Sequence, residues 1–146
     1  MFRGHHNFTV DQKGRLSVPV KFKDVLAGKN DFRLMITYFE GCLISYPMDE
    51  WEKLEKKFTQ LPQFKPAVRN FVRTFLSPAE ECVLDKQGRI LIPQSLRNKA
   101  KLEKDVLLMG MLNCFEIWNP SEWEILKGNG GVDSEELQKF LEEFGI

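Results

Sequence analysis

The chain has 146 residues, of which 42% are hydrophobic and 29% charged, with 21 basic and 21 acidic side chains. This length fits one domain, or two small ones that share a core, and no apolar run approaches the roughly 20 residues of a membrane span. The first six residues contain no apolar stretch like that of a secretory signal, so we expect a cytoplasmic protein with no membrane partner.

The neutral total hides an uneven distribution of charge along the chain. Residues 1–29 contain six basic and two acidic side chains, and residues 85–104 again contain six and two. Residues 133–143 reverse this balance, with five acidic residues and one basic residue. The zero net charge argues against a nucleic-acid partner, whereas the two separate basic segments favour one.

A β-hairpin turn is predicted close to the start of the chain. It follows a strand at residues 8–10. Asp11 suits the first position of a type I turn, because its carboxylate accepts hydrogen bonds from backbone N–H groups ahead of it, and Gly14 can take a positive φ. Residues 15–18 then alternate polar and apolar side chains, which predicts a strand with one apolar side. Pro19 favours the start of a short helix over residues 19–28.

Further strands and helices complete the first half of the chain. A helix that starts at Pro47 has acidic residues in its first turn and lysines in its last, the order that the helix dipole favours. Its apolar face carries Trp51, Leu54 and Phe58. The other predicted elements are strands at 32–37 and 43–46 and a helix at 66–76.

The chain then repeats itself. Residues 85–93 match residues 11–19 in the pattern Asp-x-x-Gly-Arg-apolar-x-apolar-Pro, and residues 114–123 echo residues 42–51. A unit of ~45 residues is near the lower limit for folding alone, so we expect the two copies to bury their apolar faces on each other. The predicted elements of the second copy are strands at 82–84, 90–92, 106–111 and 115–118, and helices at 93–100 and 120–126.

These elements predict an α+β fold in four segments. The segments are a first β unit at 5–52, a helical linker at 53–80, a second β unit at 81–125, and a Gly-rich linker with an acidic C-terminal helix at 126–146. The last helix is expected to start near a cap at Asp133 or Ser134. Its apolar side carries Leu137, Phe140, Leu141 and Phe144. This helix is interpreted as a packing or solubilising element, or as an arm that competes with a polyanion for the basic face.

The repeated turns carry the candidate binding residues. Asp and Gly are explained by turn geometry alone, but the turn does not require the arginine that follows Gly, or a lysine between Asp and Gly. Both copies supply them, as Lys13 with Arg15 and as Lys86 with Arg89. An aspartate paired with the arginine across the hairpin would orient the guanidinium, and two such forks side by side suit phosphates or guanine edges.

With these motifs the chain resembles the MraZ family of bacterial transcriptional regulators. The resemblance rests on the paired Asp-x-x-Gly-Arg motifs, the Leu-Ser-Val-Pro and Ile-Leu-Ile-Pro that follow them, the Met-Phe-Arg-Gly start and the two helices with Pro and Trp. It covers Met1 to about Leu126. It implies two SpoVT/AbrB-like units that form one pseudo-twofold, swapped-hairpin barrel within a single chain.

The resemblance also implies a function. It implies ring-shaped homo-oligomers, a location at the nucleoid, and repressor-like, sequence-specific binding of double-stranded DNA at repeated sites ahead of the division and cell-wall gene cluster. The family's DNA-binding signature falls on Asp11 with Arg15 and on Asp85 with Arg89. The candidate DNA-binding residues are Arg3, Lys13, Arg15, Lys86 and Arg89, with Asp11, Asp85, Gly14 and Gly88 as the residues that orient them.

The sequence also bears on two other functional classes. A protein-interaction module such as an antitoxin is the alternative, because AbrB-like barrels also occur there and the tail helix could hold a partner. An enzyme is not expected, since the sequence has no Gly-rich phosphate loop, no metal-spaced His/Cys cluster and no defensible Ser-His-Asp order. No catalytic residue, cofactor or metal site is therefore predicted.

The histidines and cysteines are expected to play no catalytic part. Adjacent residues of a strand point to opposite faces, so His5 and His6 would be poor joint metal ligands, and contact with solvent or phosphate is preferred. Cys42, Cys82 and Cys114 are expected to be free, buried side chains that act as small hydrophobes. The aromatic residues follow core periodicities, which argues against stacking on single-stranded nucleic acid.

Overall fold

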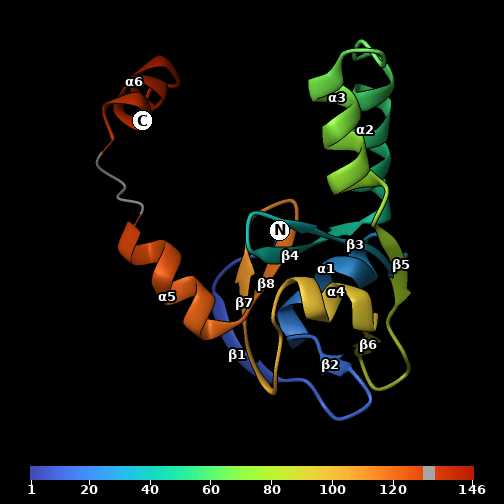
Figure 1. Cartoon of the computed structure of the whole chain (residues 1–146). Helices are drawn as coiled ribbons and strands as arrows, with labels where there is room; N and C mark the ends of the chain where they lie inside the picture. Colours follow the sequence, from blue (N-terminus) through green and yellow to red (C-terminus); the bar gives the residue numbers. More distant parts are fainter. Residues whose placement is uncertain (130–133) are drawn as a thin grey trace.

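The computed structural model describes residues 1–129 and 134–146 (Figure 1). Its strands are β1 (His5–Thr9), β2 (Arg15–Ser17), β3 (Arg33–Phe39), β4 (Cys42–Pro47), β5 (Glu80–Val83), β6 (Arg89–Leu91), β7 (Asp105–Gly110) and β8 (Phe115–Trp118). Its helices are α1 (Val20–Gly28), α2 (Met48–Thr59), α3 (Pro66–Phe71), α4 (Gln94–Lys99), α5 (Pro120–Asn129) and α6 (Glu135–Glu143), and α3 runs on into a π-helical turn, η1 (Val72–Leu76).

The two copies of the repeat exchange strands. All pairings are antiparallel, and the strands of the larger sheet follow the order β1-β7-β8-β4-β3-β5. The first strand of each copy therefore pairs with the third strand of the other copy: β1 with β7, and β5 with β3. The second strands, β2 and β6, form a two-stranded ribbon of their own. This order reads the same when the copies are interchanged, which confirms the predicted swapped-hairpin, pseudo-twofold α+β fold.

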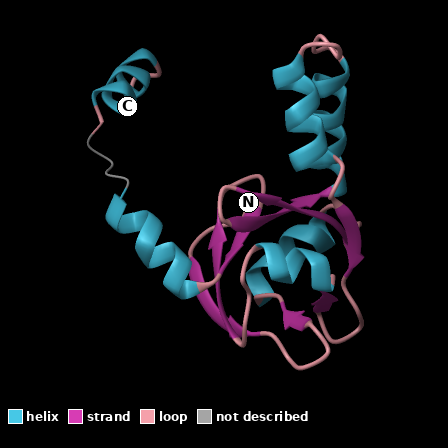
Figure 2. Cartoon of the chain, in the orientation of Figure 1, coloured by secondary structure: helices cyan, strands magenta, loops and turns pink. Residues whose placement is uncertain are grey.

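The main core lies between the curved sheet, the ribbon and the two short helices (Figure 2). Phe22 of α1 and Leu96 of α4 are buried in the same cluster as Leu16 and Ile90, which face each other across the ribbon. Phe22 also contacts Phe115 at a ring-centroid distance of 5.0 Å. Both copies thus contribute to one core, as the small size of each copy requires.

A helical hairpin of α2, α3 and η1 projects from the end of the barrel opposite the ribbon (Figure 1). Its base is a second apolar cluster that includes Trp51, Phe71 and Phe75. The sequence predicted one helix over 66–76, whereas the chain turns π-helical at Val72, and the N–H of Ser77 donates to the carbonyl of Val72 over 2.8 Å. The buried Thr37 hydroxyl donates to the Phe75 carbonyl, which ties this hairpin to the sheet.

The C-terminal helix α6 begins as expected. The Ser134 hydroxyl caps it by accepting from the N–H of Leu137 over 3.1 Å. Asp133 and part of the predicted Gly-rich linker lie outside the described residues. The expected segment boundaries stay predictions. Strands of both units lie in the same sheet.

Among the helices in the described residues, none is both long and apolar enough to cross a membrane.

Candidate nucleic-acid interface

The first turn is held together by the Asp11 carboxylate. One of its oxygens accepts from the N–H groups of Lys13 and Arg15, each over 2.9 Å, and the other accepts from Nε of Arg15 over 2.7 Å. Gly14 takes a φ of +86° and donates its N–H to the Asp11 carbonyl over 3.0 Å. The predicted turn, its glycine and the pairing of Asp with Arg are all present.

The second turn repeats this geometry at Asp85. Its carboxylate accepts from the N–H groups of Gln87 and Arg89 over 2.9 Å and from Nε of Arg89 over 3.1 Å. Gly88 has a φ of +74°. One contact has no counterpart in the first turn: Nη2 of Arg89 also donates to the Gln87 side chain over 3.0 Å. Arg89 is therefore held at two points and Arg15 at one.

The pKa of both aspartates is lowered. The backbone N–H of Arg15 is the main cause that lowers the pKa of the Asp11 carboxyl, and the Arg15 guanidinium lowers it further. The backbone N–H of Arg89 lowers the pKa of Asp85 in the same way. Each carboxylate thus stays charged at neutral pH and holds Nε of its arginine.

The ribbon places the two turns together. Arg15 lies opposite Leu91 and Ser17 lies opposite Arg89, so both arginines stand on the ribbon face that points away from the buried Leu16 and Ile90. The turns flank this ribbon at one end of the barrel (Figure 1). The N–H of Val18 donates to the Gly88 carbonyl over 3.0 Å, and that of Ile92 to the Gly14 carbonyl over 2.9 Å. Each copy therefore fixes the turn of the other.

Two basic residues that the sequence reasoning missed cover the turn glycines. Arg97 of α4 lies over Gly14, where an added Cβ would come within 2.7 Å of the guanidinium carbon. Lys23 of α1 lies over Gly88 in the same way. The signal was present in the sequence, because Lys23 and Arg97 are each four residues after the proline of their repeat, at the same offset of 74.

Arg97 is more firmly held than Lys23. Its Nε donates to the Ile92 carbonyl over 2.9 Å and its Nη2 to the Gln94 side chain over 3.2 Å. No hydrogen bond or ion pair of the Lys23 ammonium was found among the described residues. Each basic residue lines an open cleft of its own beside the turn that it covers, about 490 Å³ at Arg97 and about 440 Å³ at Lys23.

Of the other candidate DNA-binding residues, the two lysines lie in the turns and Arg3 does not. Lys13 and Lys86 are exposed within the turns. Arg3 is also exposed, but it precedes β1 and lies near Leu112, whereas the turn follows the other end of that strand. The structure thus brings together every candidate except Arg3, whose DNA-binding role stays a prediction that this placement does not support.

The histidines and cysteines lie away from the turns. His5 and His6 point to opposite sides of β1, as predicted, and Nε2 of His6 lies 3.1 Å from the Arg3 carbonyl. The three cysteines are free; Cys42 and Cys82 are buried and Cys114 is half-buried. Burial raises the pKa of all three thiols, to about 12 for Cys82 and about 11 for Cys114.

The chain is similar to known proteins over its full length. The model of the MraZ protein family, whose description likens it to antitoxins, matches residues 1–74 and 75–136. A protein of Syntrophobacter fumaroxidans named transcriptional regulator MraZ is 47% identical over 97% of this chain and 92% of its own length. Proteins of the same name from Pelotomaculum thermopropionicum and Alkaliphilus metalliredigens are each 42% identical over 100% of this chain and at least 99% of their own lengths.

Proposed function

Because the chain belongs to the MraZ family, we propose that it is a transcriptional regulator that binds double-stranded DNA through its two turns. The single observation that carries this proposal is the pair of arginines, each braced by an aspartate, on the outer face of one ribbon. Lys13 and Lys86 extend the basic surface on either side. No catalytic step is assigned to any of these residues.

The chemistry of the arginines supports reading of base edges as well as contact with phosphates. With Nε bound to Asp11, the terminal nitrogens of Arg15 remain available for a planar acceptor pair, such as O6 and N7 of guanine. A bidentate contact of this kind discriminates by roughly 1–3 kcal/mol against the wrong base. Arg89, with one terminal nitrogen bound to Gln87, presents fewer free donors and fits a phosphate.

A single chain presents few basic contacts, so affinity requires several copies. The family resemblance extends the proposal to a ring-shaped homo-oligomer in the cytoplasm and at the nucleoid, which acts as a repressor on repeated sites ahead of the division and cell-wall gene cluster. Joined motif pairs on adjacent sites would gain a factor of ~10² or more in avidity.

A gel mobility-shift assay with the DNA that lies upstream of this protein's own gene tests the proposal. Arg15→Ala and Arg89→Ala should each weaken binding, and each lost phosphate contact should lower the dependence of log K on log salt concentration by about 0.9. Lys127→Ala on α5, which removes one positive charge away from the ribbon, is the matched control. A scrambled DNA of equal length separates specific from non-specific binding. Equal retardation of the wild type and both arginine variants would refute the site.

A protein-binding role is the second candidate. It is favoured by the antitoxin-like description of the family and by the exposed apolar side of α6. A protein partner that binds the full chain but not the Phe140→Glu variant, together with unaltered DNA binding in Arg15→Ala, would favour this role over the first.

A further inference from the structure

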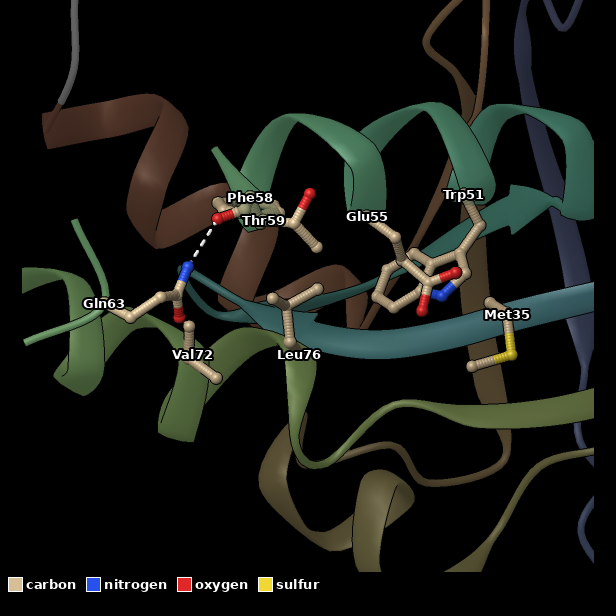
Figure 3. A pocket seen from close by; sticks show the side chains of 8 residues that line it. All are labelled: Met35, Trp51, Glu55, Phe58, Thr59, Gln63, Val72 and Leu76. Carbon is tan, nitrogen blue, oxygen red and sulfur yellow. Dashed lines mark hydrogen bonds between the residues drawn. The ribbon is translucent and has the colours of Figure 1, made fainter. Parts of the chain in front are cut away.

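An apolar groove runs along the helical hairpin on the side that Figure 3 shows. Trp51, Glu55 and Phe58 of α2 form one wall, and Val72 and Leu76 of η1 form the other. Met35 of β3 lies at its base, and Thr59 and Gln63 lie at its outer end. The groove has a volume of about 370 Å³, and its lining is mainly apolar.

The C-terminal helix has an apolar side that is largely exposed in the described part of the chain. α6 contains no buried residue, and the side chains of Phe140 and Phe144 are 52% and 77% exposed. Leu137, Phe140, Leu141 and Phe144 occupy positions i, i+3, i+4 and i+7, the spacing with which an amphipathic helix fills a hydrophobic groove.

The two surfaces match in length. Trp51 and Phe58 are seven residues apart along α2, and Leu137 and Phe144 are seven apart in the tail. At a rise of 1.5 Å per residue, each stretch spans about 10 Å. The tail helix can therefore lie along the groove with its four apolar side chains between the two walls.

The two surfaces also carry opposite charges. The outer part of the hairpin, residues 53–73, contains six basic side chains and one acidic side chain, Glu55, whereas residues 135–143 of α6 contain four acidic and one basic. The other acidic residues of the hairpin, Asp49, Glu50 and Glu52, lie at the start of α2. Arg69 and Arg73 lie next to the groove, around a small hollow that Val72 also lines. The acidic residues of α6 would thus meet a basic rim, which favours this helix over a basic or neutral one.

We infer that α6 of one copy docks in the hairpin groove of a second copy of this chain. The path of the chain favours a second copy over the chain's own groove. α5 starts beside β7 and contacts the start of β1, where Trp123 lies against His5. The groove borders β3, with β8 and β4 lying between β7 and β3. In Figure 1, α5 leads away from the barrel on the side opposite the hairpin.

Such a contact determines how copies assemble. Tail and groove are different surfaces, so the contact is heterologous, and each copy can give one tail and receive another. Repetition of this contact closes into a ring or runs into an open filament. The inference does not rest on DNA binding, since neither the turns nor the ribbon takes part.

Sedimentation of full-length variants tests the inference. The tail variant is Phe140→Glu with Phe144→Glu, and the groove variant is Val72→Glu, each checked for folding by circular dichroism. Thr59→Glu, at the exposed end of the groove, replaces Val72→Glu if that variant does not fold. Val20→Glu, an exposed apolar-to-acidic change at the start of α1, is the matched control. Each groove or tail variant should sediment as a smaller species than the wild type and the control.

A mixture of the two variants gives the decisive result. The groove variant keeps its tail and the tail variant keeps its groove, so together they should form a species of two chains, twice the 17.0 kDa of one. A monomeric wild type, variants that keep the wild-type mass, or a mixture without the two-chain species would each overturn the inference. Docking of α6 in its own groove would show as a lower melting temperature of both variants with no change in mass. DNA binding by the same variants, measured separately, reports on the turns alone.

Discussion

The two turns have the same backbone but hold their arginines differently. Asp11 and Asp85 make the same set of contacts to the N–H groups ahead of them. The residue two before the arginine differs, because Lys13 stands in the first turn where Gln87 stands in the second. The Gln87 side chain accepts from Arg89, whereas the terminal nitrogens of Arg15 make no hydrogen bond to Lys13 or to any other described residue. The difference shows that the turn requires the aspartate and the glycine, whereas the position of the lysine changes between the two copies.

The residues that cover the turns differ in the opposite sense, because the cover is more firmly held where the arginine is freer. Arg97 is bound to the Ile92 carbonyl and to Gln94, so the cover over Gly14 is fixed. The Lys23 side chain over Gly88 is a flexible stem that can move aside. The first turn thus combines a freer arginine with a more rigid cover, and the second combines a bound arginine with a more mobile cover.

The largest expected effect tests whether the two copies contribute equally to the core. Leu16→Ala and Ile90→Ala each remove a fully buried side chain from the ribbon. Each should lower the free energy of unfolding by about 2–5 kcal/mol, because the lost apolar burial leaves a cavity. Urea denaturation measures both. A loss at one position only would show that the core is not shared equally.

The next effect separates the two covers. Gly14→Ala and Gly88→Ala both force a side chain into a positive φ, at a cost of about 1–3 kcal/mol. Gly14→Ala should cost more, since the new methyl group meets the fixed guanidinium of Arg97, whereas the Lys23 side chain can shift. Thermal unfolding of both variants, with Gly28→Ala in open space as the control, measures the difference. An equal or greater loss for Gly88→Ala would contradict the assigned rigidity of Arg97.

A smaller effect compares the lysines of the two turns. Lys13→Gln and Lys86→Gln should each lower the salt dependence of DNA binding by about 0.9 if each lysine contacts one phosphate. The measurement is the slope of log K against log salt concentration on the same upstream fragment. A fall for one lysine alone would mean that the two turns meet the DNA unequally.

The smallest expected effect concerns the aspartate. The lowered pKa of Asp11 means that its ionised form stabilises the folded chain above its ordinary value of 3.8, and that this stabilisation disappears as the pH falls through the still lower folded pKa. The difference in stability between wild type and Asp11→Asn should therefore be constant between about pH 7 and pH 5 and shrink below pH 3.8. Urea denaturation across this range measures it, with Asp24→Asn as the control. A difference that grows on acidification would contradict the assigned ion pair.

Local features of the molecule were predictable from the sequence. The turns at Asp11 and Asp85, their positive-φ glycines and the Asp–Arg pairs follow from contacts between residues at most four apart, which the sequence spacing specifies directly. The repeat predicted one shared core, and the family resemblance implied the exchange of strands. The periodicities located the helices, apart from the π-helical turn at Val72.

Long-range placement was decided only by the tertiary structure. It put Lys23 and Arg97 over the glycines of the opposite copy and set Arg3 at the end of β1 away from the turn that follows this strand. It also built the groove between α2 and η1 from segments on either side of a proline-marked break. Such contacts join residues far apart in the chain, and they depend on how the curved sheet, the ribbon and their helices close around one core, which local spacing does not encode.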